Sequence, residues 1–198
     1  MSSPRIAPLD PPYAPETQAD FDRVMKGAPP IALFRTIARD RRLLQRFFGG
    51  GLLDRGNLTI TERETMILRT TARHGCVYEW GVHVRIFADA AHLTHAQVSA
   101  LTHGATHAVT HDPTLTDDQH LIVRLADALY DASRVDDALW AELAARWDDA
   151  ALLELLMLAG FYAKVSYVAN ALRLPPEPGT PDFNDVAPDG TTTGTAAR

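Results

Sequence analysis

The chain has 198 residues, a formal net charge of −6, 46% hydrophobic residues and a single cysteine. This length suits one ordinary domain with a sizeable core, and the composition excludes a disordered protein. The negative charge, without any basic cluster, excludes a nucleic-acid-binding surface, and one cysteine excludes an intrachain disulfide.

The first residues contain no apolar signal core, and no apolar run approaches the roughly 18 residues that a membrane span requires. We therefore expect a soluble cytoplasmic protein with no membrane partner. Five prolines occur before residue 20: Pro4, Pro8, Pro11, Pro12 and Pro15. Because proline disfavours regular packed elements, we expect residues 1–19 to form an extended arm.

Helical spacing of apolar residues predicts a single all-α domain over residues 20–178, and no segment reads as a strand. A short helix is expected at Asp20–Met25 and a longer one at Ile31–Phe48, ended by three glycines. Thr61 and Glu64 match a capping box that opens the next helix, with Gly75 as its C-terminal signal. This capping role is enough to explain Glu64 without any function.

Capping patterns place the remaining helices. Thr94–Gln97 opens a helix that reaches about His103, and Thr116–Gln119 opens another, with a loop expected over residues 104–115. Asp136 or Asp137 would cap the next helix. The last helix, about Ala150 to Arg173, is apolar on most sides and is therefore expected to be central or in an interface. Residues 179–198 are rich in Gly, Thr and Pro, which predicts a flexible tail.

The segment Cys76–His83 carries most of the chemistry. In a helix from about Cys76 to Ala91, residues at i, i+3 and i+7 share one face, so Cys76, Glu79 and His83 would lie together. A thiol in the first helical turn has a lowered pKa, although a nearby carboxylate opposes ionisation. Each residue can also be explained without any function: Cys76 would be a small core residue, and Glu79 and His83 would form an exposed salt bridge.

If the Glu79–His83 pair is buried, one group can act as a base while the other orients it. Arg69 and Arg85 are candidates for holding a substrate carboxylate, though a surface role is the plain interpretation of Arg85. The candidate substrate-binding residues are Tyr78, Trp80, Arg85 and Tyr162. The sequence contains no GxGxxG, no P-loop and no complete set of metal ligands, so we expect neither a cofactor nor a metal.

At these residues the chain resembles the carboxymuconolactone decarboxylase and alkylhydroperoxidase-D superfamily. Its peroxidase members carry a glutamate, then a Cys-x-x-Cys twelve residues later, then x-x-x-His. Glu64, Cys76 and His83 match this spacing, but Glu79 stands in place of the second cysteine. The sequence from Tyr78 to His83 resembles the Tyr-Glu-Trp-x-x-His signature of one subgroup of this superfamily. The resemblance covers about residues 30–178 and includes the stretches Leu158–Tyr162 and Asn170–Leu172.

The resemblance implies a compact all-α fold that assembles as a homo-oligomer (dimer, trimer or hexamer) and acts on a small molecule. It also gives Glu64 an orienting role beside the catalytic candidates Glu79, His83 and Cys76. Without a second cysteine, the leading hypothesis is a lyase or isomerase that uses Glu/His acid–base chemistry on a lactone or carboxylated substrate. The alternatives are a single-cysteine hydroperoxide reductase, resolved by an outside thiol, and a non-catalytic oligomeric binding protein.

Overall fold

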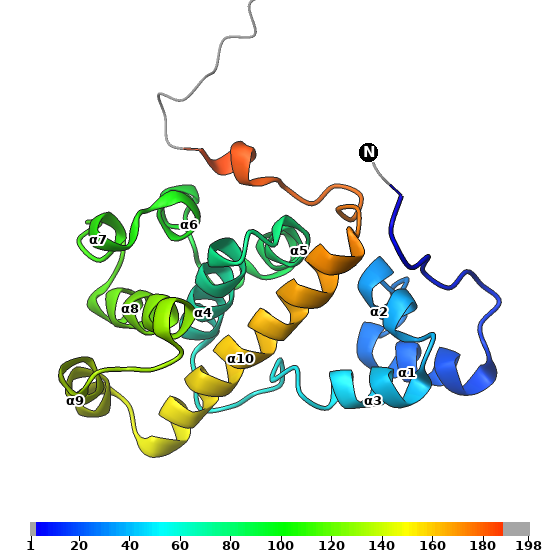
Figure 1. The fold of residues 1–198 in the computed structure, drawn as a ribbon, viewed down its shortest axis with the longest axis horizontal. Helices are drawn as coiled ribbons and strands as arrows, with labels where there is room; N and C mark the ends of the chain where they lie inside the picture. Colours follow the sequence, from blue (N-terminus) through cyan, green and yellow to red (C-terminus); the bar gives the residue numbers. More distant parts are fainter. Residues whose placement is uncertain (1–2, 188–198) are drawn as a thin grey trace, which may run out of the picture.

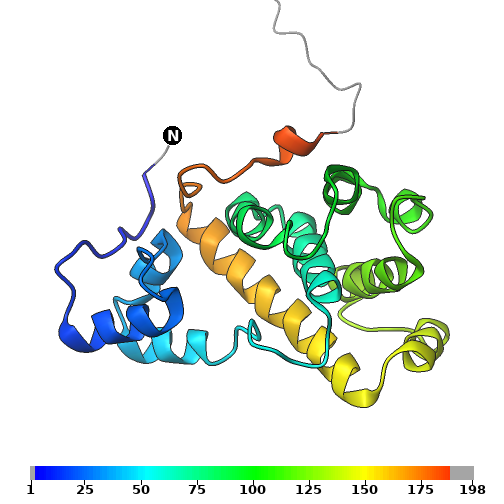
Figure 2. The same ribbon diagram turned by 180° about the vertical axis from the view of Figure 1, so that it is seen from behind.

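A computed structural model describes residues 3–187, except for the side chains of residues 106 and 107. In this part of the chain every regular element is helical, which confirms the predicted all-α fold (Figures 1 and 2). The α-helices are α1 Pro15–Met25, α2 Ala32–Ile37, α3 Arg41–Phe48, α4 Ile60–Arg73, α5 Val77–Phe87, α6 His95–His103, α7 Thr106–Val109, α8 Asp117–Ala132, α9 Asp137–Arg146 and α10 Asp149–Leu172, followed by the 3₁₀ helix η1 Phe183–Val186.

Helices α4 and α10 form the centre of the fold. Helix α4 packs against α5, α6, α8 and α10, and α10 also contacts α5, α8 and α9. Both ribbon views place α1–α3 on one side of α10 and α4–α9 on the other (Figures 1 and 2). The N-terminal helices have a small core of their own, made by Phe21, Ala38 and Leu44. The motif helix α5 thus contacts both central helices, α4 and α10.

The start of α4 differs from the prediction. Its N-cap is Thr59, whose side chain accepts from the backbone N–H of Glu62 while the Glu62 carboxylate accepts from the N-cap N–H. The sequence holds two overlapping Thr-x-x-Glu patterns, and the earlier one forms the capping box. The Thr61–Glu64 assignment was therefore wrong, and Glu64 lies buried inside the helix instead of at its end. The predicted caps at Thr94, Thr116 and Asp136 are confirmed.

Other boundaries also shift. The single helix expected over 31–48 is divided into α2 and α3, because Asp40 turns the chain and caps α3 through the backbone N–H of Leu43. A short helix, α7, interrupts the expected loop over 104–115. The expected arm over residues 1–19 already becomes helical at Pro15, and its residues 3–14 lie against the fold through bonds such as Arg39 Nε to the Ala7 carbonyl, 2.6 Å. Residues 1–2 of that arm are outside the described residues.

The segment after α10 crosses the motif helix. Arg85 donates to the Pro178 carbonyl, and a Cβ on Gly81 would lie 2.6 Å from the Pro181 carbonyl oxygen, so only glycine permits this approach. Phe183 meets the ring of Trp80 edge to face at 5.0 Å. Residues 179–187, expected to be a flexible tail, therefore pack on α5 and α6. The remainder of that predicted tail, 188–198, is outside the described residues.

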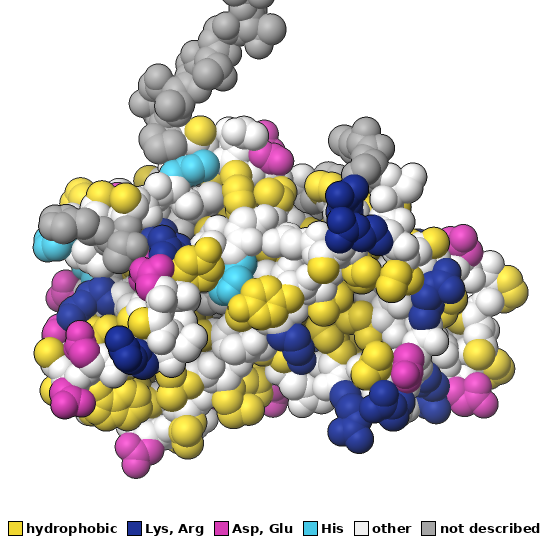
Figure 3. All heavy atoms as spheres, viewed as in Figure 1, with side chains coloured by type: hydrophobic (Ala, Val, Ile, Leu, Met, Phe, Trp, Pro, Cys, Tyr) yellow, Lys and Arg dark blue, Asp and Glu magenta, His cyan; other side chains and the backbone are white. Residues whose placement is uncertain are grey.

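Helix α10 alone, among the described residues, is long and apolar enough to cross a membrane by length and composition, a test that no segment was expected to pass. Its buried residues, among them Leu155, Leu158, Tyr162 and Val165, instead join the main core. The opposite side of α10 stays apolar as well, with Leu153, Met157 and Tyr167 about 60% exposed. Figure 3 shows hydrophobic side chains prominent over α10 on the face seen in Figure 1.

Candidate active site

The α4–α5 connection brings the predicted motif residues together. Helix α4 ends at Arg73 with His74 as its C-cap, Gly75 turns the chain with φ +60°, and Cys76 is the N-cap of α5. This short turn folds α5 back along α4, so residues of both helices face one another. Cys76 therefore lies one position before the helix in which it was expected.

Three ionisable side chains form a buried line across this contact. Nδ1 of His83 lies 2.7 Å from Oε2 of Glu64, and Nε2 of the same ring lies 3.5 Å from Oε1 of Glu79. Their side chains are only 1–9% exposed. The Glu79–His83 pair is thus an internal pair and not the exposed helix salt bridge of the plain interpretation. The imidazole stands between two carboxylates, each bound to a different ring nitrogen.

Arg63 anchors the inner end of this line. Its Nε donates to Oε1 of Glu64 at 3.0 Å, and its Nη1 donates to the Leu53 carbonyl at 3.2 Å. Its guanidinium also lies over the ring of Phe87, 5.3 Å from the centroid, and that ring packs against His83. No sequence pattern indicated these contacts, and neither Arg63 nor Phe87 was among the predicted site residues. Together they fix the position of Glu64 and of the imidazole.

Glu79, at the other end of the line, has one carboxylate oxygen that accepts no hydrogen bond from the described part of the chain. Oε2 of Glu79 is buried and has no hydrogen-bond partner among the described residues. Burying an unpaired carboxylate oxygen is costly, and in native proteins such an atom calls for an explanation. A site where a substrate proton is taken up is one such explanation.

The charges around His83 set its protonation. Burial acts to lower the pKa of His83, but the charge of Glu64 and its hydrogen bond, with Glu79, outweigh burial and raise the pKa to about 9. Near neutral pH the ring is therefore an imidazolium that donates from Nδ1 to Glu64 and forms an ion pair with Glu79 on its Nε2 side. With Arg63 paired to Glu64, the buried set holds two positive and two negative charges, which makes its burial tolerable.

Cys76 lies beside this line but is not activated by it. The residue is fully buried, and burial raises the pKa of its thiol; hydrogen bonds from the backbone and with Ser166 oppose the rise, while the Glu79 charge adds to it. The sequence left two opposing influences on the thiol pKa, the helix start and the Glu79 carboxylate, and burial outweighs the helix start. Near neutral pH this cysteine is a protonated thiol.

The candidate substrate-binding residues divide into two groups. Tyr162 does face the line: its ring meets that of His83 edge to face at 4.9 Å, and burial with the charges of Glu79 and Glu64 raises its pKa well above the ordinary value. Tyr78 instead has a structural role, since its hydroxyl accepts from the Leu33 N–H and donates to Glu177 at 2.5 Å. These bonds join α2, α5 and the segment that follows α10.

Trp80 and the two arginines point elsewhere. Trp80 is fully buried in a second core cluster with Leu68 and Leu101, away from the main core that contains Cys76. Arg85 contacts the Pro178 carbonyl, and Arg69 is buried with both its Nε and Nη2 bound to Asp127 at 2.8 Å. Neither arginine is therefore available in this structure to hold a substrate carboxylate.

No cluster of three or more His, Cys, Asp or Glu side chains suited to a metal ion occurs within the described residues. The arrangement is instead suited to proton transfer. A carboxylate with a free oxygen adjoins an imidazolium, and a second carboxylate with an arginine holds that ring in place.

Comparisons with known proteins agree with the fold. An uncharacterized peroxidase-related protein from Silicibacter sp. TM1040 superposes with a TM-score of 0.72 at 20% identity, covering 92% of this chain and 98% of its own. An alkylhydroperoxidase AhpD core protein from Ralstonia eutropha JMP134, also peroxidase-related, gives 0.69 at 19% identity, covering 87% and 93%.

The debrominase Bmp8, as a cysteine-to-alanine variant in complex with 2,3,4-tribromopyrrole, gives a TM-score of 0.65 at 17% identity, covering 87% of this chain and 91% of its own. No family model and no curated protein matches the chain. At these identities the likeness establishes the fold, and the chain has the all-α architecture of AhpD-like proteins. This confirms the AhpD-like fold that the family resemblance implied.

Proposed function

We propose that this protein is an acid–base enzyme of the lyase or isomerase type, acting on a small lactone or related carbonyl compound. The observation that carries the proposal is the buried Glu64–His83–Glu79 line with an unpaired oxygen at its Glu79 end. A binding protein without catalysis has no need to bury two carboxylates and an imidazolium in this order. The burial of the pair therefore counts against a purely structural role.

In the proposed reaction Glu79 is the base. Its free Oε2 takes a proton from the carbon next to a carbonyl group, and the C–H electron pair moves into the carbonyl to form an enolate. The Nε2–H of His83 then stabilises or protonates the developing oxyanion. The 3.5 Å separation between Nε2 and Glu79 is typical of catalytic pairs without substrate, which tighten when substrate binds.

Glu64 and Arg63 are positioning residues in this scheme. The carboxylate of Glu64 accepts a hydrogen bond from Nδ1 of His83. This bond fixes the ring so that its Nε2 is directed at Glu79 and the substrate. The ring of Tyr162 packs edge to face against the imidazole. Arg69 and Arg85 bind other groups of the protein. We therefore favour a lactone or carbonyl substrate whose binding does not depend on either arginine.

The test is deuterium exchange at the carbon next to the carbonyl of small lactones, followed by NMR in D₂O. Glu79→Gln and His83→Asn should each slow the exchange about 10²- to 10⁴-fold, the usual contribution of general acid–base catalysis. Glu142→Gln is the matched control, since Glu142 is a surface carboxylate paired with Arg124. Equal exchange rates in the wild type and both site variants would contradict the proposal.

A thiol-based activity is the second candidate, supported by the likeness to peroxidase-related proteins and to a debrominase. Against it stands the raised pKa of the Cys76 thiol, which keeps the thiol protonated near neutral pH. Hydrogen peroxide consumption with dithiothreitol decides between the two. Turnover that disappears in Cys76→Ser would favour the thiol reaction, whereas Cys76→Ser should leave proton exchange on a lactone largely intact under our proposal.

A further inference from the structure

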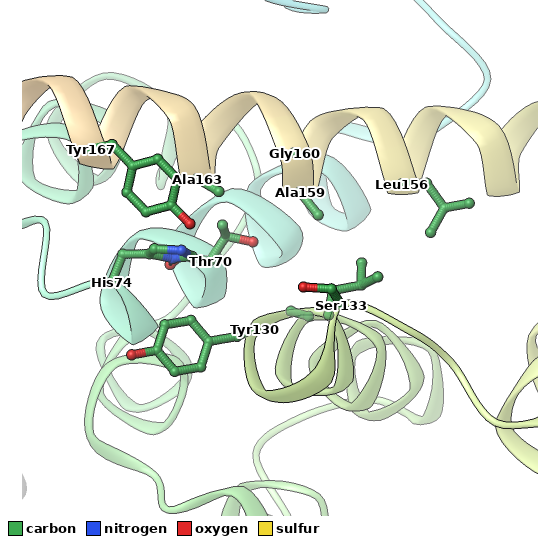
Figure 4. Close-up of a pocket in the computed structure, with 11 residues that line it drawn as sticks. Thr70, His74, Tyr130, Ser133, Leu156, Ala159, Gly160, Ala163 and Tyr167 are labelled. Atoms are coloured by element: carbon green, nitrogen blue, oxygen red, sulfur yellow. The ribbon is translucent and has the colours of Figure 1, made fainter.

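A groove of about 260 Å³ lies between α4, α8 and α10 (Figure 4), and neither Tyr162 nor His83 is part of its lining. In Figure 4 the side chains of α10 face those of His74, Tyr130 and Ser133 across open space. An apolar cavity of roughly 150 Å³ is enough for benzene, so this groove has room for a one- or two-ring molecule.

The floor of the groove is made of small residues. Ala126 of α8 and Ala159, Gly160 and Ala163 of α10 lie there, and Leu129 and Leu156 complete the aliphatic part of the lining. A Cβ added at Gly160 would meet nothing within 4 Å, so the space above this glycine is open. Small residues on two facing helices leave a flat slot instead of an interdigitated contact.

The rings of His74, Tyr130 and Tyr167 line one part of the groove. The ring of His74 meets Tyr130 edge to face at 4.8 Å and 90°, and it meets Tyr167 at 5.4 Å and 68°. Aromatic rings prefer such edge-to-face or offset partners, and here two exposed tyrosines line the groove. The arrangement favours a planar aromatic guest.

The lining contains no Asp, Glu, Lys or Arg. The nearest guanidinium, Arg73, lies over the ring of Tyr130 and is paired with Asp131 and Asp127. Nδ1 of His74 donates to the Thr70 carbonyl at 2.8 Å, so Nε2 is the ring nitrogen that is left for a guest. The hydroxyls of Thr70 and Ser133 also line the groove. Such a lining suits a neutral guest with one donor group.

We propose that this groove is a second binding site, for a small neutral aromatic molecule that carries one N–H or O–H group. The proposal does not rest on the acid–base function, because the groove and the Glu64–His83–Glu79 line share none of their residues. A few placed polar groups in a mostly apolar concave lining are typical of small-molecule sites.

The probe is 5-fluoroindole, observed by ¹⁹F NMR with the full chain. We expect saturable binding with a Kd below about 1 mM, and Gly160→Leu should weaken it about tenfold or more by filling the slot. Tyr167→Ala, at an exposed position, should weaken it independently. Leu153→Gln is the matched control, since this exposed residue of α10 lies outside the groove and its variant should bind like the wild type.

Absence of saturable binding, or unchanged binding in both Gly160→Leu and Tyr167→Ala, overturns the proposal. Sedimentation velocity on the same samples tests the competing occupant. If the chain self-associates, fluoroindole does not bind, and Gly160→Leu breaks the association, then a second copy covers the groove and the proposal is wrong. Glu79→Gln should leave fluoroindole binding unchanged, which separates this result from that of the proposed reaction.

Discussion

The protein should become less stable between about pH 6 and about pH 8.5 because of one buried histidine. His83 holds its proton in the folded state with a pKa raised to about 9, against 6.5 for an ordinary histidine. A group whose folded pKa is raised adds stability that is fully present below the unfolded pKa. That stability is then lost as the pH rises through the folded pKa.

The size of this effect follows from the two pKa values. A difference of 2.5 units between the printed values corresponds to roughly 3 kcal/mol at low pH, of which roughly 2 kcal/mol should be lost between about pH 6 and about pH 8.5. The pH window ends at about 8.5 because an unfolded cysteine loses its proton near that pH. The thiol of Cys76 has a raised pKa in the folded protein, so it causes a further loss of stability at higher pH.

The assay is urea denaturation of the wild type and of His83→Gln at several pH values within the window. Subtracting the two curves removes the contribution of the remaining histidines, which both proteins share. The free energy of unfolding of the wild type should fall by roughly 2 kcal/mol more than that of the variant. Parallel curves for the two proteins would refute the reasoning, since His83 would then hold no extra proton when folded.

Three further changes test the supports of the site. Gly81→Ala should destabilise the protein by about 1–3 kcal/mol, because the new Cβ would lie 2.6 Å from the Pro181 carbonyl oxygen; a normal urea midpoint would show that this segment does not press on α5. Asp127→Asn should cost about 3–5 kcal/mol by leaving the buried charge of Arg69 without its partner, as a thermal melt would reveal. Thr59→Ala should cost about 1 kcal/mol through loss of the α4 cap, and no loss in calorimetry would contradict the capping assignment.

Local patterns in the sequence predicted the helical elements well. Apolar periodicity and the caps at Thr94, Thr116 and Asp136 depend on residues close in the chain, so they can be read without tertiary contacts. The shared face of Glu79 and His83 is likewise a local consequence of helical geometry. Where two local patterns competed, as in the overlapping Thr-x-x-Glu motifs at the start of α4, the sequence did not decide between them.

The environment of each site residue depended on packing between distant segments. Glu64 and His83 are 19 residues apart and meet only because α4 and α5 pack together, and no periodicity reports that contact. Cys76 has the position of an activated thiol, yet burial raises its pKa. The sequence by itself determined an all-α chain with a Glu–His pair on one helix face. The tertiary structure decided that this pair is buried and that Arg63 and Glu64 hold it, because desolvation and charge pairing act through space and not along the chain.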